Sequence, residues 1–259
     1  MKSKDETRVD RLFVASVEKA FSVLEAFGTD RRDLGLSDVM ERTGMEKSAV
    51  QRYIHTLNLL GYLEKDVASR RFSLSMKVLE PANSFLRVDP LVTRATPFIF
   101  DLRRKIDGRV GVGCMHGHEA LYIIPLQSNK VVFQNAHPGF KVPLYSNTTG
   151  RVLLSSLPDE QVRKILKKYD MKKVTPYSKV TIEEVLADVQ ETRLKGYCIT
   201  EEELRLGDIN LAVPLIDSNG FTHGTVTVMC STSDFTRQDM AQKVAPIVRD
   251  TAREIMLAT

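Results

Sequence analysis

Apolar residues in the first 61 positions recur three and four residues apart, which is the spacing of one face of an α-helix. Three segments show this spacing, 16–28, 36–44 and 45–61, and each ends at a glycine, a common residue just past a helix C-terminus. A glycine turn between the second and third segments is typical of a helix-turn-helix. The pattern therefore predicts a three-helix unit near the N-terminus.

Directly after the third segment the spacing changes to that of strands. The runs 62–65 and 71–74 alternate apolar and polar residues, and the loop 66–70 between them is short enough for a hairpin. A hairpin that follows the third helix makes a winged helix-turn-helix. We place this domain at residues 10–80.

The third predicted helix carries side chains suited to reading DNA. Its apolar stripe, Val50, Ile54 and Leu57, fixes which side faces outward. In a helix-turn-helix the N-terminal half of this helix enters the major groove, where Arg, Lys and Gln pair with base edges. The expected DNA contacts are Lys47, Ser48, Gln51, Arg52 and His55 on the helix, with Lys65, Arg70 and Arg71 on the hairpin. Gln51 and Arg52 are expected at base edges; Lys47, Ser48, Arg70 and Arg71 are expected mainly at phosphates.

A second interpretation stays open for the same helix. It could be an ordinary amphipathic helix with a solvated polar face, in a sensor or interaction module that does not bind DNA. No acidic residue occurs from Lys47 through Tyr62, so local charge does not oppose phosphate, and this favours DNA binding. The net charge of +4 permits a polyanionic partner without requiring one.

The remainder of the chain predicts an α+β domain with an antiparallel sheet. Strand-like runs at 109–127 surround a His-Gly-His-Glu turn, and 130–136 is a further candidate strand. Later runs at 209–217 and 223–231 are joined by Ser-Asn-Gly, a strong hairpin signal. Helices are expected at 157–166, from a capping box at 181–184 to Gly196, and at 236–257. Hairpin-joined strands with segregated helices indicate α+β rather than α/β.

Between the two regions, residues 84–106 have a largely helical pattern that contains Pro90 and Pro97. Proline disfavours helix at the preceding residue, so both are expected to mark helix boundaries. We therefore expect a linker helix at 81–97, followed by a second domain at 98–259.

The amino-acid composition excludes several classes of protein. In 259 residues, 42% are hydrophobic and 27% charged, an ordinary globular mixture that excludes a disordered or collagen-like chain. No apolar run approaches the ~18 residues of a membrane span, and the N-terminus lacks the apolar core of a secretory signal. Three cysteines do not make a disulfide framework. We expect a cytoplasmic protein with no membrane partner.

Catalytic signals are weak. His116 and His118 stand two apart and could share a metal, but they sit in a glycine turn and no third ligand can be placed. The chain has no G-x-S-x-G, no P-loop and no G-x-G-x-x-G, and Gly111 and Gly113 are better explained by a bulge or a close backbone approach. We expect no enzyme activity, no metal and no cofactor, although an enzyme built on the second domain stays as the third-ranked alternative.

The order of these motifs resembles that of the IclR family of bacterial transcription regulators. The resemblance rests on SVEKAFSVLEAFG and LSDVMERTGMEKSAVQRYIHTLNLLGYLEKD, and downstream on VPLYSNTTGRVLLSSL, GYCITEEELRLGDINLAVPLID and TVTVMCS. It implies a GAF-like effector-binding domain after the winged helix. One departure is that Arg151-Val152 stands where the family often has Lys-Ala, which concerns pocket detail and not membership.

The resemblance also implies a ligand pocket. Its residues carry over as Val131, Gln134, Val142, Thr148, Thr149, Thr200, Asn210, Thr227 and Met229. Hydroxyl and amide groups beside an apolar wall suit a small organic acid, aromatic acids included. For each residue alone, an ordinary core or strand role is the simpler explanation.

The implied function is a ligand-responsive regulator, activator or repressor, of catabolic genes. A single recognition helix reads too short a site for useful specificity, so we expect a homodimer, or a dimer of dimers, on a pseudo-palindromic double-stranded DNA operator.

Overall fold

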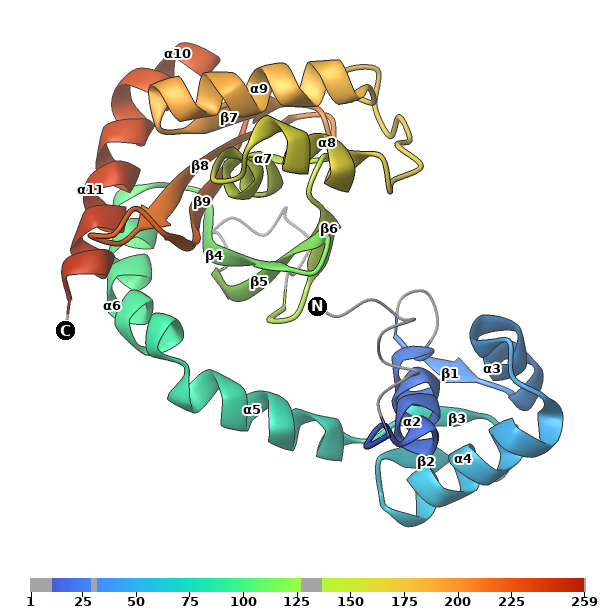
Figure 1. Ribbon diagram of the computed structural model, residues 1–259. Coiled ribbons are helices and arrows are strands. Elements are labelled where there is room, and N and C mark those ends of the chain that lie inside the picture. The colour runs from blue at the N-terminus through green and yellow to red at the C-terminus, as the bar shows by residue number, and fades with distance from the viewer. Residues whose placement is uncertain (1–10, 29–31, 127–136, 259) are drawn as a thin grey trace. The chain divides into compact units, whose positions relative to one another are not determined.

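The computed structural model describes residues 11–28, 32–126 and 137–258. The chain divides into two compact units, Met1–Arg87 and Val88–Thr259 (Figure 1). The candidate strand at 130–136, and with it Val131 and Gln134, lies outside the described residues.

The N-terminal unit is a winged helix-turn-helix. Its elements are α2 (Ala15–Glu25), β1 (Asp33–Leu34), α3 (Leu36–Thr43), α4 (Lys47–Leu59), β2 (Leu63–Lys65) and β3 (Phe72–Leu74). The three strands form an antiparallel sheet in the order β1-β3-β2. Gly44 ends α3 in the left-handed conformation at φ 67°, which turns the chain into α4 as the sequence predicts.

One apolar core holds these elements together. The apolar stripe of α4 packs against buried residues of α2, of the turn after α2, of α3 and of the sheet: Val23, Phe27, Val39, Leu34 and Leu63. Because the stripe faces inward, the opposite face of α4 is turned to solvent. A 3-10 turn (Met76–Val78) and α5 (Leu79–Val88) then lead out of the unit.

The expected linker, 81–97, covers all but the first two residues of α5 and the first half of α6 (Pro90–Lys105), with Asp89 between them. Pro90 stands in the first turn of α6 and the Asp89 carboxylate caps it by accepting from the Val92 amide at 2.9 Å, so the predicted boundary there is confirmed. The boundary predicted at Pro97 is wrong, since Pro97 lies inside α6. The cost of an interior proline, about 3 kcal/mol, is outweighed because α6 buries a row of apolar side chains on both sides of it: Leu91, Ala95, Ile99 and Leu102.

The C-terminal unit is built on a six-stranded antiparallel sheet in the order β6-β5-β4-β9-β8-β7. The strands are β4 (Arg109–His116), β5 (Glu119–Leu126), β6 (Lys141–Pro143), β7 (Cys198–Glu201), β8 (Asp208–Ile216) and β9 (Thr222–Ser231). This is the α+β architecture that the sequence predicts. The register of β4 on β5 shifts between Val112 and Gly113, as expected for a bulge.

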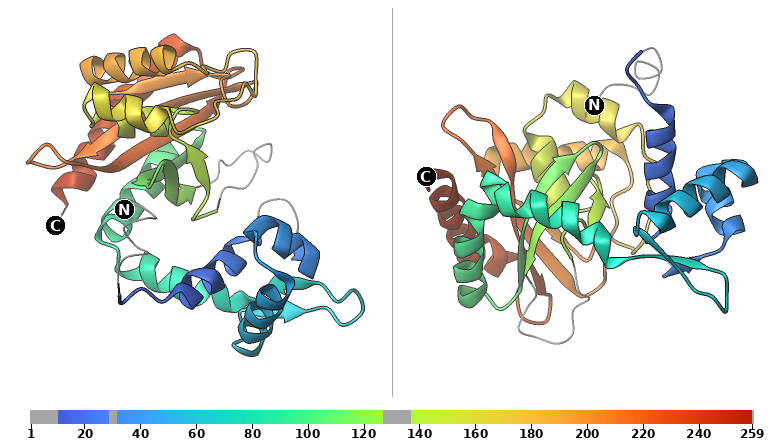
Figure 2. Two further views of the ribbon diagram at one scale, coloured as in Figure 1. Left: turned by 45° about the vertical axis from the view of Figure 1, so that its right-hand side comes forward. Right: turned by 90° about the horizontal axis from the view of Figure 1, so that it is seen from below.

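Helices cover both faces of this sheet (Figures 1 and 2). On one face lie α6 and the C-terminal helix, which runs as α10 (Arg237–Asp239), a π-turn (Met240–Val244) and α11 (Ala245–Leu257). On the other lie α7 (Thr148–Ser155), α8 (Asp159–Leu166) and α9 (Ile182–Lys195). The Thr181 capping box opens α9 and Gly196 closes it in the left-handed conformation, both as predicted.

Candidate functional site

The outward face of α4 collects the residues expected to read DNA. Lys47, Ser48, Gln51, Arg52 and His55 are all exposed. They share one face because the buried stripe of α4 points into the core of the unit. The first turn of α4 contains no carboxylate, and the N-cap residue that precedes it is Glu46.

The wing places its three expected DNA contacts differently. Lys65 and Arg70 are exposed, with Arg70 at φ 58° near the loop tip. The Arg71 side chain is only 31% exposed, and its guanidinium pairs with Asp33 at 3.0 Å and Asp38 at 2.7 Å. Arg71 therefore joins the wing to β1 and α3, and this position does not fit the expected phosphate contact.

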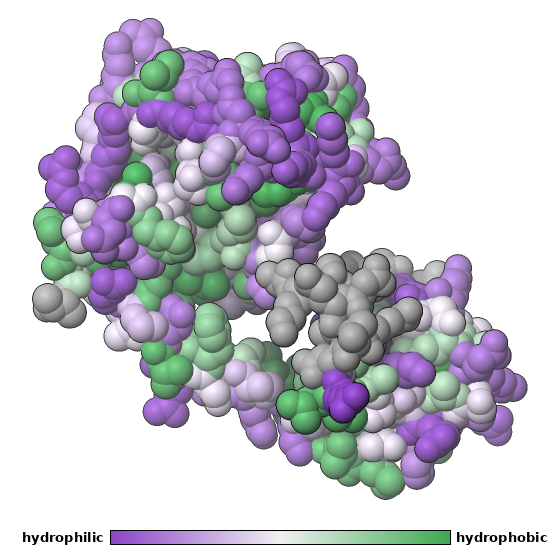
Figure 3. All heavy atoms as spheres, in the orientation of Figure 1, coloured by the Kyte–Doolittle hydropathy of each residue, from purple (hydrophilic) through white to green (hydrophobic). Residues whose placement is uncertain are grey.

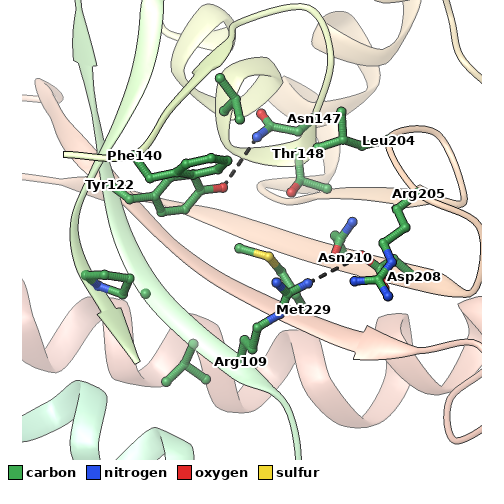
Figure 4. Close-up of a pocket in the computed structure, with 14 residues that line it drawn as sticks. Arg109, Tyr122, Phe140, Asn147, Thr148, Leu204, Arg205, Asp208, Asn210 and Met229 are labelled. Atoms are coloured by element: carbon green, nitrogen blue, oxygen red, sulfur yellow. Dashed lines mark hydrogen bonds and ion pairs between the residues drawn. The ribbon is translucent and has the colours of Figure 1, made fainter. Parts of the chain in front are cut away.

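The C-terminal unit contains a cavity of about 380 Å³ between the sheet and the start of α7 (Figure 4). Four of the expected pocket residues line it: Val142, Thr148, Asn210 and Met229. The remaining lining residues are Arg109, Val110, Gly111, Tyr122, Pro125, Phe140, Asn147, Leu204, Arg205 and Asp208. This size and mixture suit a small organic ligand.

One end of the cavity is charged. The Arg109 guanidinium on β4 pairs with the Asp208 carboxylate on β8 at 3.3 Å, and both side chains are less than 15% exposed. Burial lowers the pKa of Arg109 and raises the pKa of Asp208, and the opposite charge of each group partly offsets the effect of burial on the other. Arg205 lies close to both (Figure 4). Among the described lining residues, two cations and one carboxylate lie at this end, a surplus of positive charge that favours an anion.

Asn210 borders the same end. Its side chain is buried, at 8% exposure, and its Oδ1 atom has no hydrogen-bond partner within the part of the chain that the structure describes. A buried polar atom without a partner costs about 1–3 kcal/mol. Because Asn210 also lines the cavity, a ligand group that donates a hydrogen bond is the natural partner for this oxygen.

The opposite end is aromatic and rich in hydroxyl groups. The rings of Tyr122 and Phe140 lie 6.1 Å apart between centroids. The Tyr122 hydroxyl bonds with Thr149 at 2.8 Å and accepts from the Asn147 amide at 3.4 Å. Burial raises the pKa of Tyr122, so this phenol is neutral.

Three expected pocket residues lie outside the lining. Thr149 and Thr227 are fully buried behind it, where their hydroxyls bond to each other at 2.7 Å, and Thr200 is buried on β7. Thr149 follows Thr148 in α7, and one residue turns a helix by about 100°, so Thr148 faces the cavity and Thr149 faces the sheet.

Sequence reasoning missed several lining residues. Asn147 stands beside the expected Thr148, and its position as the α7 N-cap could have marked it. Arg109, Tyr122 and Arg205 gave no such signal, because a lone Arg or Tyr in a strand or loop has no distinctive spacing.

The glycines of β4 are needed for close packing, as expected. A Cβ on Gly113 would lie 2.7 Å from the Thr149 methyl group, and one on Gly111 would lie 2.6 Å from the Ile124 carbonyl oxygen. Larger residues here would push α7 or β5 away and change the shape of the cavity.

A buried ion cluster supports the loop that carries Leu204 and Arg205. Arg151 on α7 has no exposed surface, and it bonds to Glu203 at 2.8 and 2.5 Å and to Asp188 on α9 at 2.7 Å. Burial alone would lower the pKa of Arg151, but the hydrogen bond and charge of Glu203 outweigh it, and the pKa rises. The cluster fixes Glu203, and with it the two following residues in the cavity wall.

The two histidines considered as metal ligands do not form such a site. Both are exposed, and His118 Nε2 lies 3.0 Å from the Lys168 ammonium. Among the described residues, no group of three or more potential ligands comes together. The part of the chain that the structure describes also has no helix long and apolar enough to span a bilayer.

Comparison with known proteins agrees with this arrangement. The family model for the IclR helix-turn-helix domain matches residues 16–67, and that for the C-terminal domain of IclR bacterial transcriptional regulators matches residues 84–257. The p-hydroxybenzoate hydroxylase transcriptional activator of Acinetobacter baylyi is 33% identical over 258 residues, which are 98% of this chain and 94% of that protein.

Solved structures show the same fold. A transcriptional regulator from Rhodococcus sp. RHA1 superposes with a TM-score of 0.80 at 27% identity, covering 94% of this chain and 97% of the other. The inducer-binding domain of the PobR transcription factor from Acinetobacter, a double mutant in complex with 3-hydroxybenzoic acid, is 29% identical with a TM-score of 0.58, covering 62% of this chain and 95% of that chain. With both domains matched in order along nearly its whole length, the chain belongs to the IclR family of bacterial transcriptional regulators.

Proposed function

We propose that this DNA-binding regulator responds to a small aromatic carboxylate that binds in the cavity of its C-terminal unit. The observation that carries the proposal is the polarity of the cavity. Arg109 and Arg205 outnumber Asp208 at one end, while Tyr122 and Phe140 form an aromatic wall at the other. Relatives whose names or complexes refer to hydroxybenzoates support this class of ligand.

The carboxylate of the ligand lies at the charged end. An anion there adds to the charge compensation that the partly desolvated Arg109 receives from Asp208, 3.3 Å away. Met229 and Phe140 contact the faces of the ring, and Thr148 and Asn210 supply hydrogen bonds. A hydrogen bond to a charged group contributes about 1.5–3 kcal/mol, so loss of one cation should weaken binding at least about tenfold.

The exposed face of α4 reads the operator. Gln51 and Arg52 contact base edges in the major groove, and Lys47, Ser48 and Arg70 contact phosphates. His55 and Lys65, which are also exposed, are included among the DNA contacts. Arg71 is left out because Asp33 and Asp38 hold it. A DNA-reading function also places the protein in the cytoplasm, where bacterial DNA lies.

Two copies of the chain bind a pseudo-palindromic operator. Support comes from large apolar side chains of the N-terminal unit that are at least 50% exposed: Val17 and Phe21 on α2, and Leu79 and Phe85 on α5. Figure 3 shows apolar residues on the surface of this unit. Surface patches of this kind mark contacts between proteins. A two-fold pair sets two recognition helices about one DNA turn apart.

The test of the effector class is calorimetry on the full chain with benzoate and with cyclohexanecarboxylate. Benzoate should bind, and Arg109→Gln and Arg205→Gln should each weaken it about tenfold or more. Arg104→Gln is the matched control, since Arg104 is an exposed α6 residue whose side chain is 78% accessible. DNA affinity without effector should stay the same in all three variants. A chain that does not bind benzoate more tightly than cyclohexanecarboxylate, or Arg109 and Arg205 variants that bind benzoate as tightly as the control, would refute the proposal.

A further inference from the structure

A row of hydroxyl groups leads from the cavity wall into the sheet. Tyr122 Oη lies 2.8 Å from Thr149 Oγ1, which lies 2.7 Å from Thr227 Oγ1. Thr227 Oγ1 is 3.4 Å from Thr225 Oγ1, and Thr225 Oγ1 is 3.3 Å from the Gly113 carbonyl oxygen. The three threonines have no exposed surface and Tyr122 is 4% exposed, so bulk water does not complete these bonds.

The last member of the row determines the direction of every proton. A carbonyl oxygen only accepts, so Thr225 donates its single hydroxyl proton to Gly113. The contact between Thr225 and Thr227 is then a hydrogen bond only if the Thr227 hydroxyl donates to Thr225. By the same reasoning Thr149 donates to Thr227, and Tyr122 donates to Thr149. Every contact is satisfied when all protons point away from the cavity.

The reverse direction satisfies fewer contacts. If Tyr122 turned its proton toward the cavity, Thr149 would donate to Tyr122 and Thr227 would donate to Thr149. The Thr227 and Thr225 oxygens would then face each other with no hydrogen between them, because Thr225 still donates to the Gly113 carbonyl. Reversal therefore loses one hydrogen bond in a region closed to water, where such a loss is not recovered.

Tyr122 thus meets the ligand as a hydrogen-bond acceptor. Its phenol is neutral, its proton is directed to Thr149, and the Asn147 amide donates to one of its lone pairs. Figure 4 shows Tyr122 and Phe140 on the side of the cavity away from Arg205 and Asp208. A ligand whose carboxylate lies at the charged end brings a ring substituent to Tyr122.

We propose that the row Tyr122–Thr149–Thr227–Thr225 makes the cavity selective for aromatic acids that carry a hydrogen-bond donor on the ring, away from the carboxylate. The proposal rests on the aromatic-carboxylate function proposed above. Tyr122 is the contacting residue, and the three threonines are positioning residues that act through the direction of its proton. A ring substituent that can only accept a hydrogen bond faces a lone pair of the Tyr122 oxygen. It gains a hydrogen bond only if all the hydroxyl protons of the row reverse their direction.

Amino- and fluorobenzoates substituted at ring positions 3 and 4 are the probes. An amino group donates, whereas fluorine of similar size does not. With the full chain in calorimetry, the amino compound should bind at least about fivefold more tightly than the fluoro compound at one of the two positions, which is the effect of one hydrogen bond. Equal affinities at both positions would overturn the proposal.

Thr225→Val tests the mechanism from outside the cavity, since Thr225 does not line it. Without the Thr225 hydroxyl, reversal of the row no longer loses a bond. The fluoro compound should therefore gain affinity while the amino compound keeps its own, and their ratio should fall at least threefold. A purely structural effect would weaken both compounds alike, and that result would also overturn the proposal.

Thr149→Ser is the matched control because it keeps the hydroxyl in the middle of the row. Its ratio of amino to fluoro affinity should equal that of the unchanged protein. Circular dichroism and thermal unfolding check that both variants fold. If no benzoate of any kind binds the folded protein, the aromatic-acid function itself fails and this inference fails with it. If benzoates bind without regard to the donor, only this inference fails.

Discussion

Replacing Arg151 by Met should destabilise the C-terminal unit more than any exposed substitution. Arg151 is 0% exposed, and its guanidinium bonds to both oxygens of Glu203 and to Asp188. Met fills much of the same space but leaves the Glu203 carboxylate buried without a cation. Asp188 still keeps Lys179, which lies 2.6 Å away, so the penalty falls mainly on Glu203.

The magnitude follows from that unpaired charge. Removing one partner of a buried ion pair costs about 3–5 kcal/mol, whereas replacing both partners by apolar residues is often nearly neutral. For a domain of this size, 1 kcal/mol shifts the unfolding midpoint by ~2–4 °C, so Arg151→Met should lower it by roughly 6–20 °C. The double variant Arg151→Met with Glu203→Leu should recover most of the loss.

Differential scanning calorimetry of the unchanged protein, both single variants and the double variant completes the cycle. The two changes should be strongly non-additive, with the double variant more stable than Arg151→Met alone. Effector affinity should fall in Arg151→Met as well, because Leu204 and Arg205 follow Glu203 into the cavity wall. A single-variant loss below about 1 kcal/mol, or simple additivity, would refute the reasoning.

Three further outcomes follow from the structure. Arg70→Ala should lower the slope of log DNA affinity against log salt concentration by about 1 and leave the stability of the protein unchanged. Arg71→Ala should lower the thermal unfolding midpoint and leave that slope unchanged. If the two variants behave alike in salt titrations and thermal unfolding, this prediction is wrong. Burial raises the pKa of Cys114 to about 11, so iodoacetamide at pH 8 should alkylate it more than about a hundredfold slower than a free thiol, as mass spectrometry would show; rapid labelling of the folded protein would disprove it. Phe21→Ser, at a side chain 57% exposed, should weaken self-association in sedimentation without unfolding the protein, and an unchanged sedimentation profile would exclude α2 from the interface.

Local signals along the sequence determined most of the secondary structure. The capping box at Thr181 and the glycine at 196 bound α9 because they satisfy the helix ends with neighbouring residues. The Ser-Asn-Gly turn joins β8 to β9 for the same reason, since a tight turn depends on its own few residues. Pro97 marks the limit of such reasoning. Its local preference against helix was overridden by the burial of α6 on the sheet.

The sequence also determined which face of α4 is exposed, because an apolar stripe of helical period has only one way to reach a core. It could not determine that Arg71 is held by Asp33 and Asp38, since Asp33 and Asp38 are distant in sequence and meet the wing only when β1 pairs with β3. Arg70, its neighbour, stays exposed. Tertiary contacts thus give two adjacent arginines different environments: one is held in ion pairs and the other is exposed to solvent.

Which residues line the cavity depends on the tertiary structure. Arg109 and Asp208 are 99 positions apart, and they meet because β9 lies between β4 and β8 in the sheet. Thr148 lines the cavity while Thr149 joins the hydroxyl row, a difference set by one step of helix rotation against a fixed sheet. The sequence supplied the residue types of a ligand site. Whether each side chain faces the cavity or a buried neighbour depends on strand order and helix placement, which no local pattern encodes.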